Sequence, residues 1–379
     1  MKHIVIDARI IDTTTGRYCR GLLDGLSETA GAFDDFRYTV LVPSGASGAW
    51  QKFYGSRFEF VACDVKNYSL AEQTKLRRAL EGLKPDLVHF SMPQQPVCYK
   101  ASPVVTTFHD LTLLKTYNSD KNWLIFHAKQ KVGRWVFGKA LSRSAAIITP
   151  SNYTSDDIIQ TFDMLDGISE KIYTTYLAGE LPKAPELEKK GGDKPDRYIF
   201  HRPEKYLLYV GNQADYKNIP RLMEAHQELT KKFPDLYLVL ASPPQKATDK
   251  NRALEKKLGY KNIIFTGWLS SDELKELYKK CECYVFPSMM EGFGLPGLEA
   301  MGMGAPVAAA RATSLPEIYG KAAVYFDPTS VEDMTSAIRQ VIMDAKLRKD
   351  LVARGEKQFA KYSWKKMAGE TLEIYRKVV

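Results

Sequence analysis

Long apolar runs are missing from the sequence, and their absence bears on where the protein works. No stretch of the 379 residues approaches the roughly 18 consecutive apolar residues that a membrane-spanning helix needs. The opening residues, MKHIVIDARI, also lack the extended apolar segment of a secretory signal peptide. We therefore expect a cytoplasmic protein, either free or held peripherally at the inner face of the membrane.

Cysteine is scarce, and its spacing suggests no pairing. The five cysteines are an odd number and form no CxxC pair, which favours reduced thiols over a disulfide framework. Cys281 and Cys283 stand just before an apolar run, where burial is expected rather than metal binding. No cluster of His, Cys and Asp has the spacing of metal ligands, so the sequence predicts no metal site.

Acidic residues are outnumbered by basic ones. The chain carries 54 Lys and Arg against 45 Asp and Glu, a formal net charge of +9. Such a charge favours an acidic partner, which can be nucleic acid, an anionic membrane or a phosphorylated small molecule. The basic residues are spread over both halves and no known nucleic-acid motif occurs, so we expect no nucleic-acid partner.

One strongly basic segment runs from Lys115 to Arg143 and contains a single acid, Asp120. Its other basic residues alternate with aromatic ones at roughly helical spacing. These residues are Lys121, Lys129, Lys131, Arg134 and Lys139, with Trp123, Phe126, Trp135 and Phe137. The pattern predicts a basic amphipathic helix. Its apolar stripe either packs into the core, with the lysines in water, or meets an anionic membrane surface.

The length predicts two domains, because single cores stop growing at about 250–300 residues. Two series of six short apolar runs alternate with helix-length stretches, which is typical of parallel sheets covered on both faces. The first series is HIVIDAR, RYTVLV, FEFVAC, DLVHF, VVTTFHD and AAIITPS; the second is YLLYVGN, LYLVLAS, IIFTGW, CYVFPS, PVAAAR and AVYFDP. The fold class is therefore α/β, with two βαβ domains.

The segment between the two series interrupts every periodicity with prolines, glycines and dense charge. We place the first domain at 1–180, a linker at 181–205 and the second domain at 206–360. A helix at 361–379 is expected to pack back toward the first domain. Ligands of open α/β sheets bind beyond the carboxyl ends of the strands, so a ligand-binding cleft is expected between the domains. The GxGxxG fingerprint of a nicotinamide dinucleotide site is absent after the first strand.

The stretch EGFGLPGLE places two carboxylates, Glu291 and Glu299, around a glycine-rich loop. Pro296 suits the first helical position, so a helix is expected to open near Leu295, with Glu299 in its first turn. Glycines let backbone N–H groups approach a ligand, and a helix start favours an anion such as a diphosphate. Carboxylates instead accept hydrogen bonds from sugar hydroxyls. Together these features suit a nucleotide sugar.

The same region, PSMMEGFGLPGLEAMGMGAPVAAARATSLPEIYGKAAVYFDP, resembles the E-x7-E region of the family 4 retaining glycosyltransferases. Further segments in matching order are YVGNQADYKNIPRLMEAH, FTGWLSSDELKELY, VVTTFHDLTLL and IITPSNYTSDDI, so the resemblance covers nearly the whole chain. It implies the GT-B fold, in which two Rossmann-like domains face one another.

The resemblance also implies roles for individual residues. Glu291 would hold the 3- and 4-hydroxyls of the donor sugar, Glu299 the ribose hydroxyls, and Lys217 the diphosphate. His109 would reach the donor sugar or its phosphate from the other domain. The remaining donor-side residues are Gly292, Phe293, Gly294 and Leu295 through their backbone N–H groups, and Trp268 near the base.

Two positions depart from the family pattern, and the acceptor side is less defined. Asn212 stands where many members carry an arginine, and Lys321 where an acid is common. Acceptors are expected to meet the first domain at Gly16, Arg17 and the basic segment after Lys115. Each candidate has a simpler structural explanation when taken alone, such as a helix-dipole carboxylate, a surface lysine or a core histidine.

The expected activity is retaining transfer of a hexose from a nucleoside-diphosphate sugar to a glycan or lipid-linked glycan. No cofactor or metal is expected, and GDP-mannose is favoured over UDP-hexoses as the donor. The alternatives are a catalytically silent nucleotide-sugar-binding protein and a GT-B epimerase or phosphorylase. An epimerase needs a second acid/base pair and a phosphorylase a lysine-bound pyridoxal phosphate, and neither is apparent in the sequence.

Overall fold

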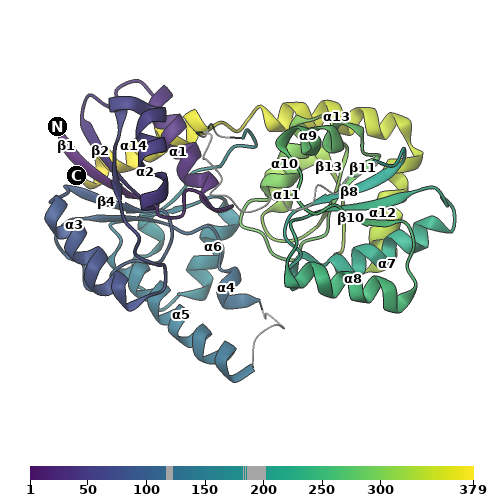
Figure 1. The fold of residues 1–379 in the computed structure, drawn as a ribbon, viewed down its shortest axis with the longest axis horizontal. Helices are drawn as coiled ribbons and strands as arrows, with labels where there is room; N and C mark the ends of the chain where they lie inside the picture. Colours follow the sequence, from purple (N-terminus) through teal and green to yellow (C-terminus); the bar gives the residue numbers. More distant parts are fainter. Residues whose placement is uncertain (117–122, 182, 184, 186–201) are drawn as a thin grey trace. The chain divides into compact units, whose positions relative to one another are not determined.

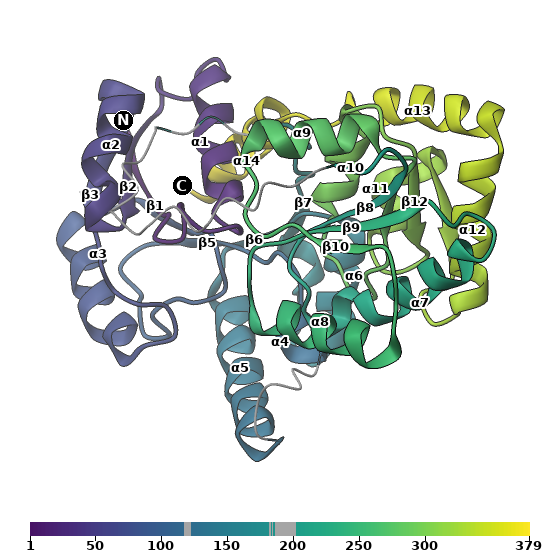
Figure 2. The same ribbon diagram turned by 45° about the vertical axis from the view of Figure 1, so that its right-hand side comes forward.

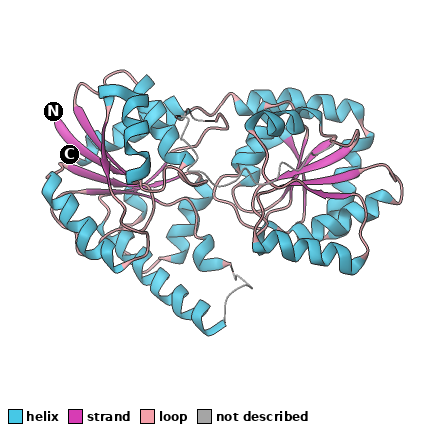
Figure 3. Cartoon of the chain, in the orientation of Figure 1, coloured by secondary structure: helices cyan, strands magenta, loops and turns pink. Residues whose placement is uncertain are grey.

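The computed structural model describes residues 1–116, 123–181, 183, 185 and 202–379, so most of the predicted linker lies outside the described residues. These residues fall into two compact units. Unit 1 comprises those within Met1–Lys115, Trp123–Lys189 and Tyr362–Val379, and unit 2 mainly those within Lys190–Lys361. Each unit has its own parallel sheet with helices on both faces (Figures 1 and 3).

Unit 1 contains a seven-stranded sheet of order β3-β2-β1-β4-β5-β6-β7, in which every described pairing is parallel. Its strands are β1 (Lys2–Asp7), β2 (Phe36–Val42), β3 (Glu59–Ala62), β4 (Leu87–Phe90), β5 (Val104–Thr107), β6 (Ala146–Thr149) and β7 (Ile172–Thr174). Its helices are α1 (Arg17–Glu28), α2 (Ser44–Tyr54), α3 (Arg77–Leu83), α4 (Thr112–Lys115), α5 (Trp123–Arg143), α6 (Asn152–Thr161) and α14 (Trp364–Val378).

Unit 2 contains a six-stranded parallel sheet of order β10-β9-β8-β11-β12-β13. Its strands are β8 (Tyr206–Val210), β9 (Tyr237–Ala241), β10 (Ile263–Phe265), β11 (Cys283–Phe286), β12 (Val307–Ala310) and β13 (Ala323–Phe326). Its helices are α7 (Ile219–Thr230), α8 (Lys246–Leu258), α9 (Ser271–Lys280), α10 (Leu295–Gly302), α11 (Leu315–Tyr319), α12 (Val331–Met343) and α13 (Ala345–Phe359).

The predicted fold class of two Rossmann-like α/β domains is confirmed, and all twelve apolar runs form strands. The central strands are buried on both faces, which is why they lack the alternation of a half-exposed sheet. Cys281 and Cys283 are buried, as expected. β7 was not predicted, because it is a three-residue strand of half-buried residues at the sheet edge and leaves no apolar run.

The strand order of each sheet reverses at one point, which locates a binding crevice. In unit 1 the sheet grows outward in both directions from the neighbouring pair β1 and β4, and in unit 2 from β8 and β11. Loops leaving the carboxyl ends of such a pair diverge to opposite faces and open a crevice above the sheet. Functional residues are therefore to be sought after β1 and β4 in unit 1 and after β8 and β11 in unit 2.

The basic segment departs from the predicted single amphipathic helix. Residues 117–122, including Lys121, lie outside the described residues, and α5 is a separate helix that projects from the rest of unit 1 (Figures 1 and 2). Phe126 and Phe137 are buried, whereas Trp135 is 55% exposed, so the apolar stripe packs into the core only in part. No described helix combines the length and apolar character needed to cross a bilayer.

The last helix, α14, packs against α1 within unit 1, as Figure 1 shows. The two helices lie so close together that only glycine fits at the positions of α1 that face Trp364. A Cβ atom at Gly21 would lie 2.2 Å from that ring, and one at Gly25 would lie 2.2 Å from the Trp364 carbonyl oxygen. The Trp364 indole donates a hydrogen bond to the Glu180 carbonyl at 2.9 Å, which fixes the ring in place.

We expect Gly21→Ala to lower the free energy of unfolding of unit 1 by about 1–3 kcal/mol, because the added methyl forces α14 away from α1. Gly48→Ala is the matched control: Gly48 also lies inside a helix, α2, but no atom lies within 4 Å of its Cβ position. The control should raise stability by about 0.5–1 kcal/mol. Urea unfolding of the full chain measures both, and equal effects of the two substitutions would contradict this packing.

Candidate functional site

Lys217 and Glu291 meet at the crevice of unit 2. Lys217 ends the 3-10 turn η4 (Asp215–Lys217) that follows β8, and Glu291 lies in the loop that follows β11. Because β8 and β11 are neighbours, the two side chains converge, and Lys217 Nζ donates to Glu291 Oε1 at 2.5 Å. The side chains are only 11% and 12% exposed, so both charges are largely removed from water.

Of the two sequence-based explanations of Lys217, a solvated surface charge and a diphosphate ligand, the structure contradicts the first. The residue is not a solvated surface charge, because it is 9% exposed and its ammonium lies 5.0 Å from the ring centroid of Tyr216 and 5.6 Å from that of Phe286. Without a ligand, its charge is matched by Glu291. A charge buried to this extent is costly unless it is paired, so any ligand that separates the two must supply a partner for each.

The loop that follows β12 holds the backbone of Glu291 at both ends. Thr313 Oγ1 accepts a hydrogen bond from Glu291 N at 3.1 Å, and Ser314 Oγ donates to Glu291 O at 2.9 Å. Thr313 adopts a φ of 50°, a left-handed conformation that a β-branched residue rarely takes and that costs of order 1–3 kcal/mol. Neither residue was predicted from the sequence, where the one available signal was a pair of hydroxyl side chains at the carboxyl end of an expected strand.

The glycine-rich loop is shaped by Tyr319. Gly292, Phe293 and Gly294 are buried, and Gly294 has a φ of 91°. The hydroxyl of Tyr319 donates to Gly294 O at 2.5 Å, and a Cβ atom at Gly294 would lie 2.5 Å from that hydroxyl. Gly294 is therefore required both for its backbone conformation and for the close approach of the tyrosine.

The helix α10 opens at Leu295, as predicted, with Gly294 as its N-cap. The start of a helix presents unpaired N–H groups and a partial positive charge, which suits an anion. The expectation that Glu299 lies in the first turn is wrong: the helix starts four residues earlier, so Glu299 is in the second turn. It is half-buried and accepts a hydrogen bond from the Tyr278 hydroxyl of α9 at 3.0 Å, so that tyrosine orients the carboxylate.

The remaining donor-side candidates lie at different points of unit 2. Asn212 is exposed after β8, and its side-chain oxygen accepts from Ala214 N at 3.2 Å. Trp268 follows the edge strand β10 and is 66% exposed, at the carboxyl edge but two strands from β8. Lys321 precedes β13, at the amino edge of the sheet, so this departure from the family pattern lies on the side away from Lys217 and Glu291.

His109 belongs to unit 1, where it follows β5. Its Nε2 lies 3.0 Å from the Ser91 carbonyl oxygen, and its ring stands edge-on to Tyr18 at a centroid distance of 5.0 Å. Burial lowers the pKa of His109 to about 4, so the ring is neutral at pH 7. A carbonyl oxygen can only accept, which puts the single ring proton on Nε2 and leaves Nδ1 as an acceptor.

The two acceptor-side candidates have structural contacts within unit 1. Gly16 is the N-cap of α1, and a Cβ atom there would lie 1.9 Å from the Ile10 carbonyl oxygen. The guanidinium of Arg17 donates to the carbonyl oxygens of Gly179 and Glu180 at 3.0 and 3.1 Å. Gly16 thus allows the loop after β1 to approach its own backbone closely. Arg17 anchors the segment that contains Gly179 and Glu180, which α14 also contacts.

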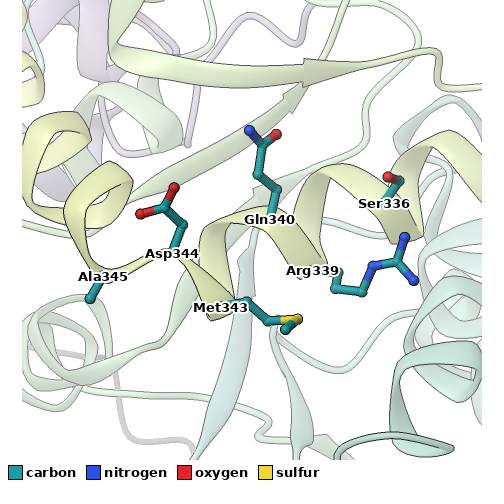
Figure 4. Close-up of a pocket in the computed structure, with 6 residues that line it drawn as sticks. All are labelled: Ser336, Arg339, Gln340, Met343, Asp344 and Ala345. Carbon is teal, nitrogen blue, oxygen red and sulfur yellow. The ribbon is translucent and has the colours of Figure 1, made fainter.

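A depression elsewhere in unit 2 is lined by residues near the junction of α12 and α13 (Figure 4). They are Ser336, Arg339, Gln340, Met343, Asp344 and Ala345, and none is a candidate site residue. Among the residues that the structure describes, no three His, Cys, Asp or Glu side chains are grouped as metal ligands would be.

Family models match both halves of the chain. The model of "Glycosyltransferase Family 4" matches residues 16–174, and that of "Glycosyl transferases group 1" matches residues 194–358. The O-antigen chain mannosyltransferase B of Escherichia coli is 28% identical over 320 residues, which are 82% of this chain and 80% of that protein. The serotype-specific mannosyltransferase WbdA of Escherichia coli is 26% identical over 83% of this chain. The matched region covers only 40% of the length of WbdA.

Solved structures show the same fold. Sucrose-phosphate synthase from Thermosynechococcus elongatus aligns with a TM-score of 0.75 at 16% identity, covering 100% of this chain and 99% of that one. The HepE protein of Anabaena, solved with UDP and glucose, aligns with a TM-score of 0.72 at 16% identity over 99% of both chains. At these identities the likeness concerns the fold alone.

We expect Lys217→Met and Glu291→Gln each to lower the free energy of unfolding by about 2–4 kcal/mol without ligand, because each leaves the other group buried without its partner. The double variant should cost less than the sum, with a coupling of about 1–3 kcal/mol. The matched control is the exposed pair Lys205–Asp235, whose Lys205→Met and Asp235→Asn should couple by less than about 1 kcal/mol. Urea unfolding gives both cycles, and additive effects at Lys217 and Glu291 would contradict a buried ion pair.

Proposed function

The chain belongs to the glycosyltransferases, and we propose that it transfers a hexose from a nucleoside-diphosphate sugar to a hydroxyl of a glycan or lipid-linked glycan. The observation that carries this proposal is the Lys217–Glu291 pair, which lies beside a glycine-rich helix start at the strand-order reversal of unit 2. One ligand that carries an anion and sugar hydroxyls can replace both partners of the pair.

On binding, the diphosphate accepts hydrogen bonds from the ammonium of Lys217 and from the N–H groups at the start of α10. Hydroxyls of the donor sugar donate hydrogen bonds to the carboxylate of Glu291. The ion pair is thus exchanged for two ligand contacts, and neither charge is left alone. Glu299, oriented by Tyr278, accepts from the ribose hydroxyls. Because Asn212 stands where many family members carry an arginine, Lys217 and the helix start carry most of the diphosphate charge.

In the reaction, the bond between the anomeric carbon and the diphosphate oxygen breaks, and its electron pair leaves with the diphosphate. A new bond forms from the anomeric carbon to the acceptor oxygen, and the acceptor proton passes to the leaving phosphate. Lys217 and the N–H groups of the loop stabilise the charge that develops on the leaving group. The resemblance to family 4 supports attack from the same face, hence retention, without a metal or cofactor.

His109 is better suited to the donor sugar than to a phosphate. Its ring is neutral at pH 7, with Nε2–H committed to the Ser91 carbonyl, so it has no charge to offer an anion. The remaining lone pair on Nδ1 can accept a hydrogen bond from a sugar hydroxyl. Of the two roles that the sequence left open for His109, we therefore propose the sugar contact.

GDP-mannose is the donor that we favour, since two of the relatives are named as mannosyltransferases. UDP-hexoses are the alternative, since the HepE structure contains UDP and glucose. Release of GDP or UDP from the two donor types, with glycan acceptors present, decides between them. Nucleotide binding without release under all these conditions would instead favour the silent binding protein.

We expect Glu291→Gln to lower turnover at least about tenfold, or ~1.4 kcal/mol, because the contact with the donor sugar is weakened. Affinity for the free nucleoside diphosphate should stay equal or rise, because Lys217 no longer has to leave Glu291. Lys321→Gln, at the opposite edge of the sheet, is the control and should change neither quantity. Steady-state kinetics and calorimetry test this, and a parallel loss of turnover and nucleotide affinity in Glu291→Gln would indicate a structural role.

An anionic membrane surface is a second proposed partner, and the exposed face of α5 supports it. Trp135 is 55% exposed, with Lys131 one turn before it and Lys139 one turn after it on the same face, and Val132 beside them is 62% exposed. An exposed indole between lysines suits the boundary between lipid headgroups and acyl chains. Such a contact would bring the protein to a lipid-linked acceptor.

The triple variant Lys131→Gln, Trp135→Ser, Lys139→Gln should release the protein from vesicles containing phosphatidylglycerol, and wild-type binding should fall steeply with salt. The control is Lys256→Gln, Lys257→Gln, Leu258→Ser at the exposed end of α8, which removes the same charges and one apolar side chain from unit 2. Vesicle sedimentation is the measurement. A wild-type protein that ignores these vesicles at low salt, or equal release by both variants, would remove the membrane proposal.

A further inference from the structure

Four polar side chains form a continuous chain of hydrogen bonds inside unit 1, and each of them is at most 2% exposed. They are Tyr375 of α14, His89 of β4, Thr107 of β5 and Tyr18 of α1. The Tyr375 hydroxyl lies 2.5 Å from His89 Nδ1, and His89 Nε2 lies 2.8 Å from Thr107 Oγ1. Thr107 Oγ1 in turn donates to the Tyr18 hydroxyl oxygen at 2.9 Å. The chain therefore links α14 to α1 through two neighbouring strands.

The protons of this chain have one arrangement. Thr107 gives its single hydroxyl proton to Tyr18, so its oxygen accepts from the N–H at His89 Nε2. Burial lowers the pKa of His89 to about 3, so the ring is neutral at pH 7 and carries only that one proton. Its Nδ1 is then an acceptor, which takes the hydroxyl proton of Tyr375. Every bond of the chain thus points from Tyr375 toward Tyr18.

The fold does not need this chain for its stability. Buried hydrogen bonds replace bonds with water, so apolar side chains of the same shape in these positions can be about as stable. What a fully satisfied polar network adds is rigidity, because each hydrogen bond holds a side chain in a single rotamer. The side chain held at the end of the chain is that of Tyr18.

Tyr18 packs edge-on against His109, with the ring centroids 5.0 Å apart and the ring planes at 74°. The His109 ring is half-buried, and its Nε2 donates to the Ser91 carbonyl oxygen at 3.0 Å. That one hydrogen bond fixes the position of Nε2 but not the tilt of the ring about the bond. The Tyr18 ring, packed at a set angle, restricts this tilt and hence the direction of the lone pair on Nδ1.

We propose that Tyr18 is a positioning residue for His109 and aims its Nδ1 at a hydroxyl of the donor sugar. His89 and Thr107 act one step further away, because they hold the Tyr18 ring in place. The inference rests on the proposed function, in which His109 contacts the donor sugar, and adds the residues that set the direction of this contact. A nucleoside diphosphate without its sugar makes no such contact, so its affinity should not depend on Tyr18.

The kinetic test compares two substitutions of Tyr18. Tyr18→Leu removes the ring that faces His109 and should lower kcat at least about tenfold, because a catalytic contact is sensitive to small displacements. Tyr18→Phe keeps the ring and loses only its hydrogen bond, so kcat should fall by about three- to fivefold. In both variants the affinity for GDP or UDP, measured by calorimetry, should stay within about twofold of wild type.

Tyr38→Phe is the matched control for Tyr18→Phe. Tyr38 is also a buried tyrosine of unit 1, and its hydroxyl donates to the Ala32 carbonyl oxygen at 2.8 Å. Because each substitution removes one buried hydrogen bond, both should lower the melting temperature by roughly 2–4 °C. Only Tyr18→Phe should lower kcat. Equal losses of kcat in the two variants would assign Tyr18 to the stability of the fold and overturn the proposal.

Nitrogen-15 NMR of the histidine rings of the full chain tests the geometry without any donor. Wild-type His109 should carry its proton on Nε2 at pH 7, and His109→Gln identifies its signals by their loss. Tyr18→Leu should shift or broaden these signals, because the ring is no longer held at one tilt. Tyr38→Phe should leave them as in wild type. If Tyr18→Leu does not fold, Tyr18→Phe is judged by the same signals.

The remaining outcomes also decide the matter. If Tyr18→Leu transfers sugar as fast as wild type, the positioning role is wrong although the proposed function stands. If the Tyr18 variants weaken GDP or UDP as much as they lower kcat, the effect does not pass through the sugar contact and the proposal is wrong. If no donor is used by wild type but the His109 signals depend on Tyr18, the proposed function fails and the positioning by Tyr18 stands.

Discussion

The cost of burying a charge is the constraint on which the site in unit 2 depends. Lys217 and Glu291 come from loops after adjacent strands and leave water together, each stabilising the other. The arrangement stays intact without a ligand, yet it can be broken by a molecule that brings a replacement for each partner. The proposed function draws its selectivity from this requirement, since an anion alone or a neutral sugar alone would leave one buried charge uncompensated.

Strained backbone occurs at the carboxyl edges of both sheets. Thr313 accepts a hydrogen bond from the backbone N–H of Glu291 while in a left-handed conformation, and Tyr68 takes a similar conformation in the loop that follows β3 of unit 1. The central strands are buried on both faces. Burial of the sheet interiors offsets the free-energy cost of these loop conformations. This is expected when functional residues lie on loops that a rigid scaffold holds in place.

Much of this could be predicted from the sequence, because buried parallel strands leave apolar runs and only the short edge strand β7 leaves none. Glu291 was identified from the glycine-rich stretch that it opens, and Lys217 and His109 from the resemblance to family 4. Their contacts could not be predicted, because the ion pair depends on which strands are neighbours. The direction of Trp135 depends on which face of α5 is covered, and no local pattern reports either fact.

The packing of α14 on α1 has a consequence for the order in which the protein is made. Helix α1 is synthesised before every element of unit 2, and α14 is synthesised after them. The groove that Gly21 and Gly25 open for Trp364 is therefore empty while unit 2 is being made. Unit 2, whose elements are all complete by Lys361, can close first, although it is encoded second. Until α14 has been synthesised, the nascent amino-terminal unit carries an uncovered apolar groove that chaperones can recognise.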